Sequence, residues 1–166
     1  MFRRLYPKIR LSWSVVNKYL RGDIQGIKDY MIEKDFSNEA MHRGKILHEA
    51  LEVWMPKLEL KLGKDPIQEY RFELETPQYI FTGVIDYMDS KILVDWKTGS
   101  INGYAKQLNL YNWALKELGH KNREMYIVKV NDELVVEAIR KTRLKEENYY
   151  ELLDKVYNFI NIYIRK

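Results

Sequence analysis

Cysteine is absent from this 166-residue chain, and its absence excludes several classes of protein. Without thiols the chain can form no disulfide framework, no thiolate zinc site and no cysteine-ligated iron–sulfur cluster. No apolar run approaches the roughly 18 residues that a membrane helix needs. The N-terminus also lacks the apolar stretch of a signal peptide. We therefore expect an intracellular, cytoplasmic protein without a membrane anchor.

The composition is that of a globular protein, with 46% hydrophobic and 31% charged residues. A chain of this length can bury one substantial core, so we predict a single domain over residues 1–166. The formal net charge is +4. The basic residues gather in two clusters: Arg3, Arg4, Lys8, Arg10, Lys18 and Arg21, and then Arg140, Lys141, Arg143 and Lys145. Such clusters could bind phosphate groups or form a solvated surface, and charge alone does not decide between the two.

The apolar pattern predicts an α/β domain with a mixed central β-sheet flanked by helices. We expect a basic arm or edge strand over residues 1–10, followed by helices from Ser12 or Ser14 to Tyr19, from Asp23 to about Ile32 and from Ser37 to about Lys61. Three strands should follow, over residues 67–75, 79–87 and 91–98, and then a helix over 104–118. The chain should end with hairpin strands over 124–130 and 134–141 and a final helix from Leu144. Pro56 should kink or break the long helix. Gly119 should end the helix that precedes it.

Charged residues interrupt the apolar pattern where two expected strands lie close in sequence. The apolar run from Ile92 to Val94 leads directly into Asp95, Trp96 and Lys97. Because side chains alternate along a strand, Asp95 and Lys97 should project to one face and Trp96 to the other. Asp86, near the end of the preceding strand, reaches the same place if the two strands pair. Two carboxylates and a lysine around one point predict a site for a hard divalent cation beside a positive charge.

Three further sets of residues bear on this site. His48 lies on the expected long helix, where a lone histidine is more often a surface or packed residue than a ligand. Gln107 and Tyr111 are four residues apart on one helical face, and by themselves they indicate packing with a polar edge. The third set is acidic: Glu69, Glu73 and Glu75. These glutamates alternate with apolar residues, so they predict the solvated face of a strand unless one of them points into the site.

Taken together, the motifs resemble the RecB-type branch of the PD-(D/E)XK nuclease superfamily, which includes recombination exonucleases and the small CRISPR-adaptation exonucleases. The matching motifs are Gly83-Val-Ile-Asp86, Val94-Asp95-Trp96-Lys97-Thr98-Gly99, Gln107-Leu-Asn-Leu-Tyr111, Arg43-Gly-Lys-Ile-Leu-His48 and the opening Ser12-Trp-Ser helix. The resemblance covers about residues 12–115. Many relatives carry one cysteine after the opening helix and three near the C-terminus for an iron–sulfur cluster. Here Tyr19-Leu20-Arg21-Gly22 follows that helix, so packing of the C-terminal helix must replace the cluster.

The resemblance implies a metal-dependent deoxyribonuclease, expected to act as an exonuclease on single-stranded DNA ends, with endonuclease action left open. It implies that Mg²⁺ or Mn²⁺ is held by His48, Asp86, Asp95 and the main-chain carbonyl of Trp96. Glu73 would be a further acid of the site, and Glu69 and Glu75 are the alternatives to Glu73. Lys97 would be catalytic rather than a salt-bridge partner of Asp95, and Gln107 and Tyr111 would position the lysine or the DNA backbone.

Two other hypotheses remain open. The chain could be a DNA-binding accessory protein of recombination or repair on a nuclease-like fold with little or no activity. It could also be a structural domain whose charges form an internal salt-bridge network. The pathway (repair, recombination, viral replication or CRISPR adaptation) and the oligomeric state do not follow from the sequence.

Overall fold

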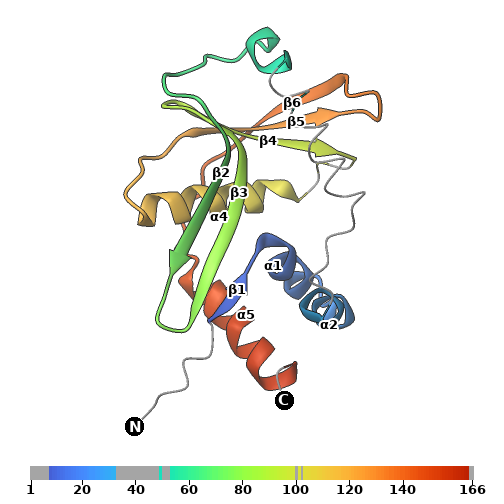
Figure 1. Ribbon diagram of the computed structural model, residues 1–166, viewed down its shortest axis with the longest axis vertical. Helices are drawn as coiled ribbons and strands as arrows, with labels where there is room; N and C mark the ends of the chain where they lie inside the picture. Colours follow the sequence, from blue (N-terminus) through green and yellow to red (C-terminus); the bar gives the residue numbers. More distant parts are fainter. Residues whose placement is uncertain (1–7, 33–48, 50–52, 100, 102, 165–166) are drawn as a thin grey trace. The chain divides into compact units, whose positions relative to one another are not determined.

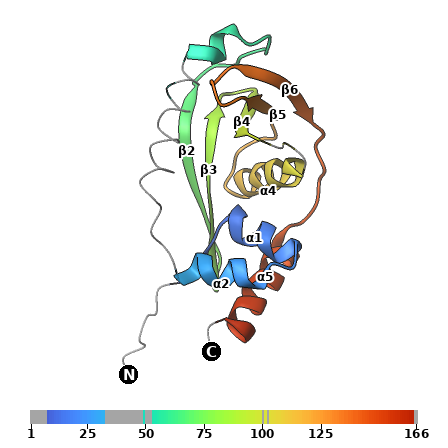
Figure 2. The same ribbon diagram turned by 90° about the vertical axis from the view of Figure 1, so that its right-hand side faces the viewer.

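The computed structural model describes residues 8–32, 49, 53–99, 101 and 103–164 and has a central mixed β-sheet flanked by helices (Figure 1, Figure 2). The elements are β1 (Ile9–Leu11), α1 (Trp13–Leu20), α2 (Ile24–Ile32), the 3₁₀ helix η1 (Met55–Lys57), β2 (Ile67–Glu75), β3 (Tyr79–Met88), β4 (Ile92–Thr98), α4 (Tyr104–Glu117), β5 (Glu124–Val130), β6 (Val136–Thr142) and α5 (Tyr150–Tyr163). This arrangement confirms the predicted fold class. Within the described ranges, no helix is both long enough and apolar enough to cross a bilayer.

Two compact units make up the chain. The first comprises Met1–Glu33, Phe72–Gly83 and Asn148–Lys166, and the second comprises Lys34–Arg71 and Val84–Glu147. Strands β2 and β3 continue from one unit into the other. The single domain expected over residues 1–166 stays a prediction.

In the first unit, β1 pairs in parallel with the start of β3, and α1 packs against α2 and α5. The rings of Tyr19 and Phe159 meet edge-on at 5.6 Å between centroids. The Asp23 carboxylate caps α2 by accepting a hydrogen bond of 2.9 Å from the backbone N–H of Gly26. The two expected N-terminal helices are therefore confirmed, and the C-terminal helix packs against the first of them.

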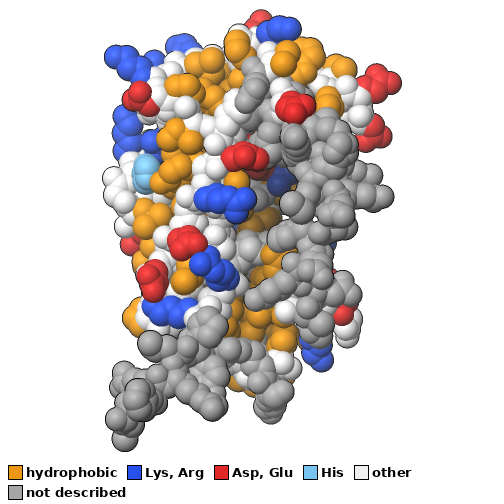
Figure 3. Space-filling model, in the orientation of Figure 1, with side chains coloured by type: hydrophobic (Ala, Val, Ile, Leu, Met, Phe, Trp, Pro, Cys, Tyr) orange, Lys and Arg blue, Asp and Glu red, His pale blue; other side chains and the backbone are white. Residues whose placement is uncertain are grey.

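Two basic residues of the N-terminal cluster pair with neighbouring acids. Lys8 Nζ lies 2.6 Å from Glu75 Oε1, and Arg10 Nη1 lies 2.6 Å from Glu73 Oε1. Figure 3 shows acidic and basic side chains interspersed on the visible face. The described part of this cluster thus presents less unpaired positive charge than its residue count indicates.

In the second unit, β4 lies between β3 and β5. It pairs antiparallel with β3 (Tyr87 opposite Val94) and in parallel with β5. Parallel neighbours require a crossover connection, and α4 provides it. Figure 1 and Figure 2 show α4 running along one face of β4 and β5.

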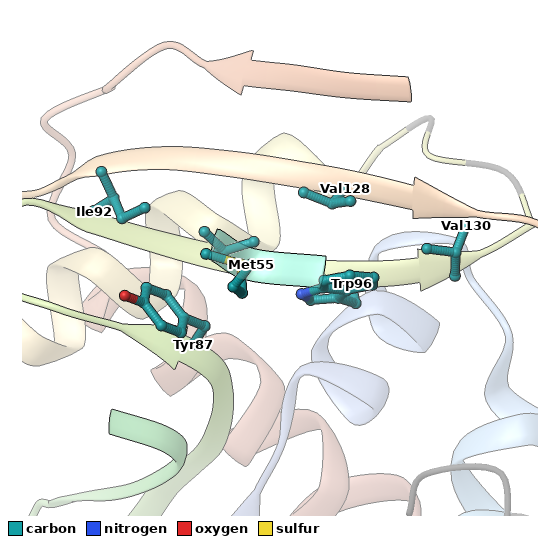
Figure 4. Close-up of a cluster of buried hydrophobic side chains, with 7 residues drawn as sticks. Met55, Tyr87, Ile92, Trp96, Val128 and Val130 are labelled. Carbon is teal, nitrogen blue, oxygen red and sulfur yellow. The ribbon is translucent and has the colours of Figure 1, made fainter. Parts of the chain in front are cut away.

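The opposite face of β4 and β5 carries an apolar cluster that η1 covers (Figure 4). Its buried members are Met55, Tyr87, Ile92, Val94, Trp96, Val128 and Val130. Trp96 is only 3% exposed. Since side chains alternate along the strand, Asp95 and Lys97 project to the α4 face. The predicted separation of Trp96 from its two charged neighbours is confirmed.

The helix expected to run to about Lys61 ends earlier in the structure. Helical backbone at Val53 and Trp54 tightens into the 3₁₀ turn η1, and Leu58 is extended. Pro56 is the physical reason, because it lacks a backbone N–H and its ring crowds the preceding turn. The earlier part of this helix, residues 37–48, lies outside the described residues.

Two other boundaries differ from the sequence expectations. Strand β6 begins at Val136 rather than residue 134, because the Asn131 side chain accepts hydrogen bonds from the backbone N–H groups of Glu133 and Val135. Helix α5 begins at Tyr150 rather than at Leu144. The predicted end of α4 is confirmed: Gly119 adopts a φ of 98° and donates its N–H to Lys116 O at 3.0 Å.

The buried carboxylate of Asp89, 2% exposed, organises the turn between β3 and β4. It accepts hydrogen bonds of 2.7–2.9 Å from the backbone N–H groups of Gly63, Lys91 and Ile92 and from the hydroxyl of Tyr87. Burial alone would raise the pKa of Asp89, but these hydrogen bonds outweigh it and hold the pKa below its usual value. The ionised carboxylate is therefore part of the folded structure.

Asp89→Asn should destabilise the protein by about 2–3 kcal/mol, because an amide cannot accept this set of hydrogen bonds. The pKa of Asp89 is lower in the folded state than in the unfolded state. The contribution of its carboxylate to the free energy of unfolding is therefore present above the unfolded-state pKa of about 3.9 and is lost as the pH falls through the folded-state pKa. Urea unfolding at pH 7 and near pH 3 should show a difference from wild type that shrinks at low pH. Asp132→Asn, at an exposed turn position, is the matched control; equal effects of the two substitutions would contradict this role of Asp89.

Candidate functional site

Strands β3 and β4 bring Asp86, Asp95 and Lys97 together on the α4 face of the second unit. Their register pairs Tyr87 with Val94 and Met88 with Leu93, so one further step places Asp86 opposite Asp95. The backbone N–H of Trp96 donates a hydrogen bond of 2.8 Å to Asp86 Oδ2. The convergence expected from the sequence is therefore observed for these three residues.

Burial and the neighbouring Asp95 strongly influence the ionisation of Asp86. Asp95 is 6% exposed and Asp86 is half-buried. Burial raises the pKa of Asp86 well above its usual value, and the charge of Asp95 and a hydrogen bond to it raise the pKa further. The N–H of Trp96 and the ammonium of Lys97 act in the opposite direction but do not cancel the effect. Asp86 therefore holds a proton more readily than an ordinary aspartate does.

Lys97 has two close neighbours. Its Nζ lies 3.0 Å from Asp95 Oδ2, and it lies 4.1 Å from the centroid of the Tyr104 ring. The expectation that Lys97 would not act as a salt-bridge partner of Asp95 needs correction in this respect, because the ion pair is present. Even so, the buried Oδ2 atom accepts no hydrogen bond of acceptable geometry from any described residue. The two charges are close, but the heavy atoms of the pair do not have the geometry of a hydrogen bond.

Gln107 and Tyr111 are two of the buried polar side chains of helix α4. Gln107 Nε2 donates to the Tyr111 hydroxyl at 3.3 Å. Within the described part of the chain, Gln107 Oε1 is buried and has no hydrogen-bond partner. Leaving a buried amide oxygen unpaired is costly, so such an atom indicates a place for a water molecule or a ligand. The adjacent Leu108 is fully buried, in agreement with the expected packing role of this part of the helix.

The remaining candidate ligands are not assembled by the described residues. His48 lies outside the described residues. Glu73 belongs to the first unit and pairs with Arg10, while Glu69 is exposed on β2. The residues with described positions contain no group of three His, Cys, Asp or Glu side chains that could hold a metal ion. The metal-binding roles of His48, Glu73 and the Trp96 carbonyl therefore stay predictions.

Tyr104 is the residue that the sequence reasoning missed. It is the first residue of α4, directly after Gly103, which has a φ of 85°. Its spacing could have indicated it, since Tyr104, Gln107 and Tyr111 stand at positions i, i+3 and i+7 of one helical face.

Comparison with known proteins gives evidence on the fold. No protein-family model matches the chain, and no curated protein sequence matches it. Among solved structures, the crystal structure of a protein named SSO0001 is similar, with a TM-score of 0.56, 15% sequence identity, and coverage of 98% of this chain and 81% of that one. The structure named "Putative exonuclease" from Eubacterium rectale has a TM-score of 0.42 and 17% identity, over 90% of this chain and 63% of that one. The first likeness shows a shared fold alone, and the second carries no argument about activity.

Asp86→Asn should stabilise the metal-free protein at pH 8 by about 0.5–2 kcal/mol. The pKa of Asp86 is higher in the folded state than in the unfolded state. The protein therefore has its full free energy of unfolding below the unfolded-state pKa of about 3.9, and loses part of it as the pH rises through the folded-state pKa and Asp86 ionises. Asparagine stays neutral, so the variant does not lose this part of the free energy of unfolding as the pH rises. Urea unfolding with EDTA at pH 8 and pH 4 should show a gain at pH 8 that vanishes at pH 4. A variant less stable than wild type at pH 8 would contradict the raised pKa.

Proposed function

We propose that the chain is a divalent-metal-dependent deoxyribonuclease that hydrolyses phosphodiester bonds in DNA, with exonuclease action on single-stranded ends as its principal mode. The observation that carries this proposal is the meeting of Asp86, Asp95 and Lys97 on one face of the sheet. The motif resemblance to the RecB-type branch of the PD-(D/E)XK superfamily supports it, because the same three residues belong to those motifs.

The donor set suits a hard divalent cation. Burial and the charge of Asp95 raise the cost of ionising Asp86, and a cation can relieve the repulsion between the two carboxylates where a proton otherwise does. In the proposal Mg²⁺ or Mn²⁺ is held by Asp86, Asp95 and the carbonyl of Trp96, with His48 as a further ligand and Glu73 as an additional acid. An imidazole ligand suits Mn²⁺. The bound cation would polarise the phosphate and lower the pKa of a water molecule.

The other side chains act on the substrate in this proposal. Lys97 offsets negative charge that develops on the phosphate and orients the attacking water. Gln107, with its unpaired Oε1, and Tyr111 position the lysine or the DNA backbone. Arg140 and Arg143 are exposed on the second basic cluster and are suited to phosphate contacts, whereas Lys141 pairs with Glu124 at 3.1 Å.

A DNA-binding accessory protein of recombination or repair is the second candidate. The ion pair between Lys97 and Asp95 favours it, because a lysine committed to this carboxylate is not available to a substrate. Under this alternative the chain retains DNA without cutting it, so binding and cleavage must be measured side by side.

Purified protein incubated with end-labelled single- and double-stranded DNA should degrade it with Mn²⁺ or Mg²⁺ but not with EDTA. Asp95→Ala and Lys97→Ala should each lower the rate at least about 100-fold, because the first removes a proposed ligand of the metal and the second removes a positive charge that would stabilise the transition state. Lys155→Ala, which removes only an exposed helical ion pair with Glu151, is the matched control and should keep full activity.

Three outcomes would decide against parts of this proposal. Cleavage that survives both site substitutions would exclude the assigned site. DNA retention in a mobility assay without metal-dependent cleavage would favour the accessory protein. Cutting of circular single-stranded DNA, which has no ends, would show that the protein acts as an endonuclease and not only as an exonuclease.

A further inference from the structure

Lys97 is held at the site by an aromatic ring as well as by an acid. Its Nζ stands 4.1 Å from the centroid of the Tyr104 ring, well inside the roughly 6 Å over which a cation and an aromatic face attract each other. The Lys97 side chain is 20% exposed, so water screens this attraction only in part. The contact is therefore strong enough to influence where the ammonium lies.

Asp95 alone does not fix the direction of this ammonium. Oδ2 of Asp95 is 3.0 Å from Nζ, but that oxygen accepts no well-aligned hydrogen bond from the described residues. A lysine ammonium is a compact charge on a flexible stem with three rotatable donors, so proximity to one carboxylate leaves its orientation open. The Tyr104 ring blocks one side of the ammonium and limits the directions in which its N–H bonds can point.

The chain brings the ring back to the strand over a short connection. Strand β4 ends at Thr98 and α4 begins at Tyr104. Gly99 and Gly103 both have positive φ, at 112° and 85°, a conformation that side-chain-bearing residues rarely adopt. Tyr104 also shares its helical face with Gln107 and Tyr111, at spacings of three and seven residues. The same helix thus carries the ring and the buried amide on one side.

We infer that Tyr104 is a positioning residue that holds the Lys97 ammonium in its working place through its aromatic face. This inference rests on the proposed function where it concerns hydrolysis, but the contact itself can be tested without it. The ring does not depend on the state of Asp95, so it keeps the lysine in place when that carboxylate is engaged by another group. The aromatic face supplies the effect and the hydroxyl is not required.

Two substitutions separate the ring from the hydroxyl. Tyr104→Phe keeps the aromatic face, and Tyr104→Leu removes it while leaving an apolar side chain at the start of α4. Tyr30→Leu is the matched control, because Tyr30 also lies under a lysine, with Lys18 Nζ at 5.5 Å from its centroid, in the other unit of the chain. Circular dichroism and thermal unfolding establish that each variant is folded.

The first readout does not involve DNA. The rate at which an amine-acylating reagent modifies Lys97, followed by peptide mass spectrometry at fixed pH, reports how accessible the side-chain amine is to the reagent. We expect Tyr104→Leu to raise this rate about threefold or more, in line with the loss of one cation–π contact. Tyr104→Phe and Tyr30→Leu should leave it within about twofold of wild type.

The second readout is DNA hydrolysis with Mn²⁺ over a range of substrate concentrations. Tyr104→Leu should lower kcat about tenfold, which corresponds to ~1.4 kcal/mol, with KM changed less than about twofold. Tyr104→Phe should restore kcat to near the wild-type value. A residue with a merely structural role would not produce this split or this rescue.

The outcomes keep the two proposals apart. An unchanged acylation rate in Tyr104→Leu overturns the positioning role whatever the nuclease activity. So does a Tyr104→Phe variant that differs from wild type as much as Tyr104→Leu does, in the acylation rate or in kcat. If Lys97 acylation rises in Tyr104→Leu while the wild-type protein cleaves no DNA, the contact stands and the proposed function fails.

Discussion

The carboxylate of Asp89 fixes the turn between β3 and β4, and the geometry of the candidate site depends on that turn. By accepting the N–H groups of Lys91 and Ile92, it sets the register in which Met88 faces Leu93. Because side chains alternate along a strand, a slip of one residue would move Asp95 and Lys97 to the face where the apolar cluster packs. The turn therefore decides whether the two carboxylates can share a face at all.

The resulting pair of carboxyl groups is unfavourable for the folded protein taken alone. Asp86 and Asp95 repel each other when both are ionised, and the N–H of Trp96 and the ammonium of Lys97 compensate this only in part. The opposite face of β4 offsets the cost, because Val94 and Trp96 are buried there against η1 and β5. A pair of partly compensated carboxyl groups on a largely buried strand is the kind of local cost that functional sites often carry.

The faces of β4 could be predicted because strand alternation is a local property and Ile92 to Val94 mark the buried strand. The role of Asp89 could not, because its partners include Gly63, 26 residues away, and nothing local indicates that contact. The late start of α5 has the same cause: the Asn109 side chain on α4 donates to the carbonyl of Arg143 and accepts from the N–H of Lys145, which ties that segment to α4 outside any helix. Tertiary hydrogen bonds here override a helical pattern that the sequence carries. The position of His48, on which a complete ligand set depends, lies outside the described residues.

A structural ion pair and a catalytic lysine place different demands on the groups around them. A buried ion pair adds stability only with well-aligned hydrogen bonds, and apolar residues of similar size often serve as well. The pair of Lys97 and Asp95 is close at 3.0 Å but lacks that alignment among the described residues, and the nearby helix carries the unpaired amide oxygen of Gln107. An internal salt-bridge network would explain neither the poor hydrogen-bond geometry of the Lys97 ammonium nor the unpaired amide oxygen of Gln107. In the proposed nuclease, a phosphate group and a water molecule bound at this face would use both groups, because the ammonium can donate to the phosphate and the amide oxygen can accept from the water.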